Sequence, residues 1–290
     1  MNRRVIALAV LAIWAVGIGW LYRRNTLRTP EQILAEAALR ISPATWYYIL
    51  EQNGKQVGAA SSAIDTTTSM ILSSDFLRGA VPVGPDTLRL EARSEASFTR
   101  GLRLRDFNVR ATGDLAPLAL RGVMQKGDDN TLLLTSKNEG DRAITQEMIV
   151  SRALFVPTMS PLPLLLRGTP RTGDTAQVAI FDPVSRRIRD ATMRIEADSL
   201  FLVSDSARFH SPTGRWVRAR QASVRGWRIT AREAPITAWV DASGRLLAAS
   251  EPGGISLVRT TFELSFENWR LATAGKGRGS TPFPARTPGR

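Results

Sequence analysis

Side chains able to carry out catalysis are scarce in this 290-residue chain. It contains no cysteine and one histidine, His210, which excludes thiol nucleophiles, disulfide frameworks, iron–sulfur clusters and zinc fingers. A serine hydrolase would need His210 beside a nucleophile, but the sequence contains no Gly-x-Ser-x-Gly motif. We therefore predict that His210 ends a strand and is held there by hydrogen bonds.

Carboxylates are the remaining groups for acid–base chemistry. A hydrolase could use Asp182, Asp241 or Glu263, because carboxylates serve as general acids and bases. Asp182 precedes a proline and Asp241 opens an Asp-Ala-Ser-Gly turn, and aspartate is common at such positions for structural reasons. A carboxylate hydrolase is therefore the least favoured class, and we expect the chain not to be an enzyme.

Metal and cofactor sites are not expected either. Asp128-Asp129-Asn130 lacks the spaced oxygen ligands of a calcium loop and is typical of a hairpin turn. Gly275-Lys276-Gly277 lacks the upstream glycine and the Ser/Thr of a phosphate-binding loop. Packing, rather than ligand stacking, is the expected role of the tryptophans at Trp46, Trp216, Trp227, Trp239 and Trp269.

The net charge of +13 comes mainly from the two ends of the chain. Residues 1–30 carry five arginines and no acidic residue, and residues 275–290 carry four basic residues and no acidic one, which leaves 30 basic and 26 acidic side chains between them. Nucleic-acid binding is therefore not expected. Because residues 275–290 are rich in glycine and proline, we predict a disordered basic tail.

The strongest local signal is the uncharged stretch 5–22. Its length is sufficient for a helix that spans the bilayer, and it ends in aromatic residues rather than in the small residues of a signal-peptidase site. Residues 1–28 are thus predicted to be a cytoplasmic head and a transmembrane signal anchor. This predicts a single-pass protein of the inner (plasma) membrane whose C-terminal domain is exported to the periplasm or the cell exterior.

Beyond the anchor, the sequence predicts a short helix and then strands. Thr29, Pro30 and Gln32 form a helix-start pattern, so residues 29–45 should contain a helix from Pro30 to about Arg40, followed by a linker. Within residues 46–274 apolar and polar residues alternate, as they do between Leu88 and Phe98. We predict a mainly β domain of antiparallel curved sheets, either an open barrel or a sandwich.

Two segments and several turns define the organisation of this domain. Residues 144–154 fit either a strand or a two-turn helix. Residues 156–166 hold three prolines among leucines, which predicts a loop with a short helix tucked under a sheet between two halves, 46–155 and 156–274. Turns are predicted at Asn53-Gly54, Pro212-Thr213-Gly214, Arg225-Gly226 and Asp241-Ala242-Ser243-Gly244.

Three segments, in this order, resemble one known domain. They are Trp46-Tyr47-Tyr48-Ile49 with Asn53-Gly54-Lys55-Gln56-Val57-Gly58; residues 162–168 with Gly173-Asp174-Thr175 and Phe181-Asp182-Pro183; and residues 236–247 with Pro252-Gly253-Gly254 and residues 258–263. Together they span residues 46–267 and are similar to the non-catalytic β-rich domain that precedes the catalytic core in bacterial transglutaminase-like proteins.

The resemblance implies an accessory role. The transglutaminase core uses a Cys-His-Asp triad, whereas this chain has no cysteine, so no catalytic residue carries over. The resemblance instead implies an exported accessory β domain. The implied fold is also similar to the curved, half-open sheets of periplasmic lipid and lipoprotein carriers.

The expected function is therefore a membrane-anchored, non-enzymatic exported module that binds a hydrophobic ligand or a partner protein in the cell envelope. Residues 5–22 would contact the lipid bilayer. The alternative is a scaffold subunit of an envelope complex, in which the edges of the sheet pair with another protein.

Overall fold

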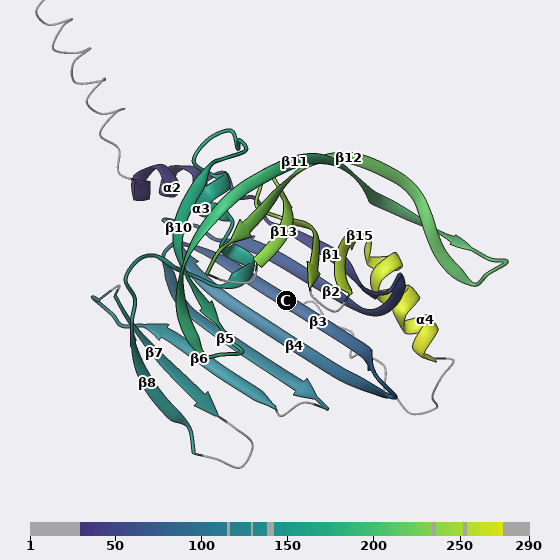
Figure 1. Ribbon diagram of the computed structural model, residues 1–290, viewed down its shortest axis with the longest axis horizontal. Helices are drawn as coiled ribbons and strands as arrows, with labels where there is room; N and C mark the ends of the chain where they lie inside the picture. Colours follow the sequence, from purple (N-terminus) through teal and green to yellow (C-terminus); the bar gives the residue numbers. More distant parts are fainter. Residues whose placement is uncertain are drawn as a thin grey trace, which may run out of the picture.

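Fifteen strands form one continuous, strongly curved sheet that remains open (Figure 1). The computed structural model describes residues 30–114, 117–128, 130–137, 142–233, 236–251 and 254–274. The predicted anchor over 5–22 and the predicted tail over 275–290 lie outside these residues. Among the helices of the described part, none has the length and apolarity needed to cross a membrane.

The strands of the first half lead away from the centre of the sheet. They are β1 (Ala44–Gln52), β2 (Lys55–Thr66), β3 (Met70–Val83), β4 (Asp86–Thr99), β5 (Leu104–Gly113), β6 (Leu118–Met124), β7 (Thr131–Lys137) and β8 (Ile144–Ile149). The second half comprises β9 (Leu154–Phe155), β10 (Thr175–Asp182), β11 (Arg187–His210), β12 (Arg215–Ala231), β13 (Ile236–Asp241), β14 (Leu246–Glu251) and β15 (Ile255–Thr260).

The two halves belong to the same sheet because its first and last strands pair. β1 is antiparallel to both β2 and β15, and the strands continue outward to β8 at one edge and β9 at the other. Every pairing is antiparallel except the short one between β9 and β10. The predicted mainly β, antiparallel, curved class is confirmed, and the architecture is a single open sheet rather than a two-sheet sandwich.

The alternation in β4 shows how the sequence defines two faces. Charged residues of this strand point to the outer face, whereas Leu90, Ala96 and Phe98 point to the inner face, which carries the core. Register with β3 places Ile71 opposite Phe98, and register with β5 places Phe107 opposite Ala96. Because side chains alternate along a strand, the concave inner face is mainly apolar in all three strands, with Ser73 and Asp75 as polar residues of β3 on that face.

Helical segments close one end of the inner face. α2 (Pro30–Ala38) begins at the predicted Pro30 and buries Leu34, Ala37 and Ala38. The proline-rich insert folds as a 3₁₀ turn, η1 (Pro157–Met159), and α3 (Leu162–Leu165), whose four residues are all buried. A loop with a buried short helix was the prediction for this insert, and the structure confirms it.

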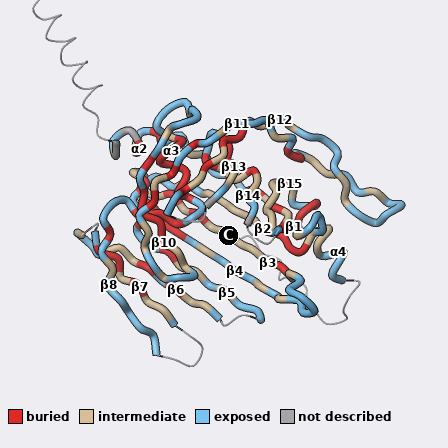
Figure 2. Tube along the Cα trace, viewed as in Figure 1, coloured by how far each residue is buried: buried red, intermediate tan, exposed pale blue. Residues whose placement is uncertain are grey.

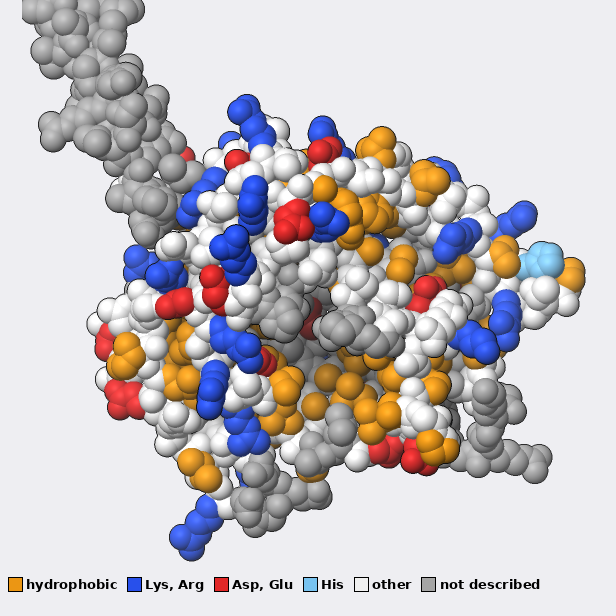
Figure 3. Space-filling model, viewed as in Figure 1, with side chains coloured by type: hydrophobic (Ala, Val, Ile, Leu, Met, Phe, Trp, Pro, Cys, Tyr) orange, Lys and Arg blue, Asp and Glu red, His pale blue; other side chains and the backbone are white. Residues whose placement is uncertain are grey.

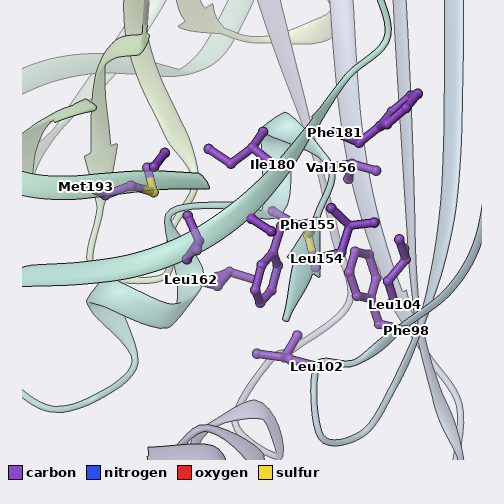
Figure 4. Close-up of a cluster of buried hydrophobic side chains, with 14 of the residues drawn as sticks. Phe98, Leu102, Leu104, Leu154, Phe155, Val156, Leu162, Ile180, Phe181 and Met193 are labelled. Atoms are coloured by element: carbon purple, nitrogen blue, oxygen red, sulfur yellow. The ribbon is translucent and has the colours of Figure 1, made fainter. Parts of the chain in front are cut away.

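The core lies at this closed end. Figure 4 shows side chains from β4, β9, β10 and the insert converging there, with Phe98, Phe155 and Leu162 among them. The rings of Phe107 and Phe181 are 4.6 Å apart between centroids. Figure 2 shows buried residues concentrated around α3 and β10, whereas the far ends of β4 and β5 are exposed. Packing therefore fills only one half of the concavity.

The predicted turn at Arg225-Gly226 is wrong, because both residues lie inside β12. A Cβ on Gly226 would be 2.6 Å from Leu247 Cδ1 and 3.0 Å from the Phe201 ring, so this glycine permits close packing rather than chain reversal. The turn falls instead at Pro212-Thr213-Gly214, as predicted. β11 and β12 consequently form a long hairpin that extends beyond β13; we call residues 199–225 the arm (Figure 1).

The C-terminal segment is helical. β15 ends at Thr260, and a π-helical turn, η2 (Glu263–Glu267), leads into α4 (Asn268–Ala274). The Phe266 ring packs 6.1 Å from Tyr47 and from Phe76 on the outer face. Two hydrogen bonds of 2.9 Å join the Asn268 side chain to the main chain of Trp216, so this segment also holds the arm.

Candidate binding surface

The half of the inner face that the core does not fill is an apolar surface open to solvent. Strand register aligns its residues: Leu77 opposes Ala92, Ala92 opposes Ala111, and Ala111 opposes Leu118. All members are partly exposed, and we call Leu77, Val81, Leu88, Leu90, Ala92, Ala111 and Leu118 the inner apolar surface. Figure 3 shows a hollow near the middle of the molecule with hydrophobic side chains beside it.

The outer face of the same strands has the opposite character. Between the inner residues of β4 lie Arg89, Glu91, Arg93 and Glu95, and Arg93 and Glu95 form an ion pair at 2.8 Å. Arg93, Glu95, Asn108 and Arg110 line a shallow polar pocket of about 200 Å³. Its charged groups are solvated and partly paired with one another, so we do not regard this pocket as the site.

Asp75 is a carboxylate on the otherwise apolar inner face. Its two oxygens accept hydrogen bonds from Ser62 Oγ at 2.7 Å and Thr158 Oγ1 at 2.9 Å. Desolvation raises the pKa of this carboxyl despite those hydrogen bonds. The side chain is partly accessible to solvent and yet surrounded by protein, as expected for a group at the base of a hollow.

A cationic group also lies near the centre of the sheet, where both it and Asp75 act electrostatically on Tyr48. The Arg245 guanidinium lies 4.2 Å from the centre of the Trp46 ring, a cation–π contact. Arg259 forms a 3.1 Å ion pair with Asp241, whose other oxygen accepts hydrogen bonds from the Ser243 and Arg245 amides. Desolvation lowers the pKa of Arg245, so its charge is maintained at some energetic cost.

Tyr48 completes the polar group at the centre of the sheet. It is buried next to Trp46 in a small second cluster, and its register partner on β15 is Arg259. Desolvation raises the pKa of its hydroxyl well above the usual range, so the phenol stays neutral at every physiological pH. Its charged neighbours are Arg259, Asp75, Asp241 and Arg245, so ionisable groups of both signs gather around this point of the sheet.

The structure keeps the candidate carboxylates in separate elements. Asp182 ends β10 and accepts hydrogen bonds from Ser185 and Val184. It also forms an ion pair with Arg189. Partial burial opposes its ionisation, but these contacts together hold its pKa below the usual value. Asp241 serves the β13–β14 turn, and Glu263 begins η2. Within the described residues, no hydrogen bond or ion pair joins any two of the three.

The other sites considered from sequence are local structural features. His210 ends β11 and its Nδ1 lies 2.9 Å from Thr213 Oγ1. Asp128 accepts hydrogen bonds from the Asn130 amide and the Thr131 hydroxyl, which lower its pKa, while Asp129 and residues 275–277 lie outside the described part. No cluster of potential metal ligands occurs among the described residues.

The tryptophans are mainly packing residues. Trp46 and Trp227 are buried, the Trp239 ring lies 5.0 Å from Phe201, and Trp216 and Trp269 are half-buried. Burial and ring contacts agree with the packing role expected of Trp46, Trp227 and Trp239. Asp75 was not predicted, although Ile71, Ser73, Asp75 and Leu77 share one face of β3, and a carboxylate within such an apolar alternation was a usable signal.

The outer edge of β8 is a second feature that can take part in binding. Val150 donates a 2.7 Å hydrogen bond to Asn130 O, next to the pair Thr131 and Ile149. Alternation in an antiparallel ladder then turns the N–H and C=O groups of Thr145, Glu147 and Ile149 away from β7. Ile149 is 77% exposed, so this edge is open for strand pairing.

Comparisons with known proteins show the fold alone. No protein family matches the chain, and no curated protein does either. A β-barrel-like protein of domain of unknown function DUF1849 from Brucella abortus is similar in structure, with a TM-score of 0.50 at 11% identity over 76% of this chain and 95% of that one. A DUF1089 family protein from Pseudomonas aeruginosa gives a TM-score of 0.36 at 11% identity over 67% and 90% of the two chains. The first of these likenesses shows that the chain shares a β-barrel-like architecture.

Proposed function

We propose that this chain is a non-catalytic binding module that holds a hydrophobic ligand, such as an acyl chain, on its inner apolar surface. The observation that supports this proposal is the unfilled half of the concavity, where most inward residues of β3 to β6 are apolar although solvent reaches them. An exposed apolar surface of this kind has a free-energy cost in water that a ligand relieves.

The chemistry of the surface favours an extended apolar ligand with a polar end. Each methylene that leaves water contributes about 0.8 kcal/mol, so a chain lying across several strands gains affinity without any cavity that encloses it. Asp75 and Arg245, near the centre of the sheet, offer a hydrogen-bond acceptor and a cation to the polar end. The anchor over residues 5–22 and export of the domain remain part of this proposal as inferred from sequence.

A charge placed on the inner apolar surface tests the proposal. Leu90→Asp should weaken binding of a fluorescent fatty-acid analogue at least tenfold, because the ligand would desolvate an unpaired carboxylate. Arg89→Asp introduces the same residue one position away, on the outer face, and should leave binding unchanged. Equal loss in both variants, with native melting curves, would show that the ligand does not lie on this surface.

The edge of β8 supports a second candidate, a scaffold that pairs its sheet with a strand of another protein. Glu147→Pro removes an outward N–H while keeping the ladder to β7, and Glu147→Ala retains that N–H. In material extracted from membranes, a scaffold should copurify with a protein that is lost in the proline variant and kept in the alanine variant. Copurification of lipid, unaffected by either change, supports the carrier instead.

A further inference from the structure

The arm exposes aliphatic side chains on the side that faces away from the body. Val203 is buried and Phe201 packs on Trp239, whereas the alternate residues Leu200 and Leu202 are 72% and 71% exposed. One face of the arm is thus used for packing, whereas Leu200 and Leu202 remain open on the other, opposite Arg225 and Ser223. Isolated apolar residues need no explanation, but adjacent ones on a projecting hairpin define a surface.

A second group of exposed side chains, aromatic and cationic, lies at the tip of the arm. Phe209 is 51% exposed and its ring lies 5.5 Å from that of its partner Trp216. Arg208, Arg215 and Arg218 are exposed around this pair, and none of them forms an ion pair with a described carboxylate. In Figure 3 the single histidine marks the tip, with hydrophobic and basic side chains around it.

From residue 205 to residue 220 the arm carries four arginines and one aspartate, and that aspartate, Asp205, is paired with Arg220 at 2.8 Å. The tip is therefore strongly cationic, in contrast to the strands of the body, where acids and bases alternate. Its complement is an anionic surface. Two hydrogen bonds join the Asn268 side chain to the main-chain N–H and C=O of Trp216. They connect the arm, near its tip, to the C-terminal helical segment.

We propose that the tip of the arm docks on the surface of a bilayer that contains anionic phospholipid. Arginine side chains would contact the headgroups, and Phe209, with Leu200 and Leu202 behind it, would enter the interfacial region, where aromatic residues are favoured. Single-stranded nucleic acid would satisfy the arginines and stack on Phe209. It offers nothing to the exposed leucines, which is why the bilayer is the favoured partner.

The absence of cysteine from the chain allows a local test in the full-length protein. Phe209→Cys, labelled with a polarity-sensitive fluorophore, should show a blue shift with vesicles of phosphatidylcholine and phosphatidylglycerol. No shift is expected with phosphatidylcholine alone, and high salt should reverse the effect. Val184→Cys, at an 87% exposed position in the β10–β11 turn, is the control for the rest of the surface and should not respond.

Removal of the charges completes the test. In the labelled protein, replacement of Arg208, Arg215 and Arg218 by serine should weaken the response to anionic vesicles by roughly 10- to 100-fold. An equal shift at Val184, a response that persists without the arginines, or a label that responds to oligonucleotide and not to vesicles would each overturn the proposal. If another part of the chain bound the vesicle, the protein would still reach the membrane. The label at position 209 would then not respond more strongly than the label at position 184.

Discussion

At the scale of single residues, the inner face combines apolar packing with one carboxylate whose ionisation is unfavourable. Asp75 has a raised pKa because of desolvation, so the folded protein holds its proton more tightly than the unfolded chain does. Stability from this group is present at low pH, and it is lost as pH rises from the unfolded pKa to the folded one. Keeping this carboxyl among apolar residues therefore lowers stability at neutral pH, a cost that a binding role would justify.

We predict that Asp75→Asn raises the melting temperature at pH 7 by a few degrees. The amide keeps an acceptor for Ser62 or Thr158 and has no charge to desolvate. The gain should vanish when melting is measured at a pH low enough to protonate Asp75 in both states. A variant less stable than the parent at neutral pH would mean that the two hydrogen bonds to the carboxylate outweigh its desolvation.

Gly122 illustrates how tightly the closed end is packed. A Cβ at this position would overlap the ring of Phe107, which is buried against Phe181. Gly122→Ala should therefore destabilise the protein by about 1–3 kcal/mol in denaturant unfolding, because the ring cannot move without opening the core. Gly168→Ala, where the new methyl group meets nothing within 4 Å, is the matched control and should be nearly neutral.

At the scale of elements, the arm and the C-terminal helix stabilise each other through one side chain. Asn268 both accepts from and donates to the main chain of Trp216. We predict that Asn268→Ala costs about 1–2 kcal/mol and speeds amide hydrogen exchange in the outer half of the arm. Exchange in β3 and β4 should not change; acceleration there as well would indicate global destabilisation rather than release of the arm.

Local signals in the sequence predicted many of these elements. The Asn53-Gly54 hairpin follows from two residues that tolerate positive φ, which the structure shows at 52° and 74°. Gly226 was misread, because glycine marks close approach as well as turns. The π-helical turn was missed because Phe262, Leu264 and Phe266 alternate with polar residues, as they would in a strand.

Candidate site residues were harder to predict than the fold class. The inner apolar surface is encoded strand by strand, as the alternation in β4 shows. Its unfilled half depends on where α3 lies, however, and Arg245 meets Trp46 only because β14 and β1 both pair with β15. Contacts between distant strands depend on curvature and register, which no short stretch of sequence specifies.

At the scale of the whole molecule, the sheet is a continuous ribbon whose edges, β8 and β9, are consecutive in the chain. Residues 150–153 join the two edges, and their main chain bonds on both sides: Val150 N donates to Asn130 O, and Ala153 O accepts from Ala179 N. One edge strand has two residues and the other six. The longer one, β8, is where a partner strand would find the most main-chain groups.

The pairing of β1 with β15 has a consequence for how the chain acquires its structure. Tyr47 pairs with Thr260, so the centre of the sheet is completed only after almost all of the strands have been synthesised. Such a topology closes a very long loop late, which predicts slow folding, in milliseconds to seconds, rather than the microseconds of local folds. A nascent chain would therefore stay incompletely folded throughout translation.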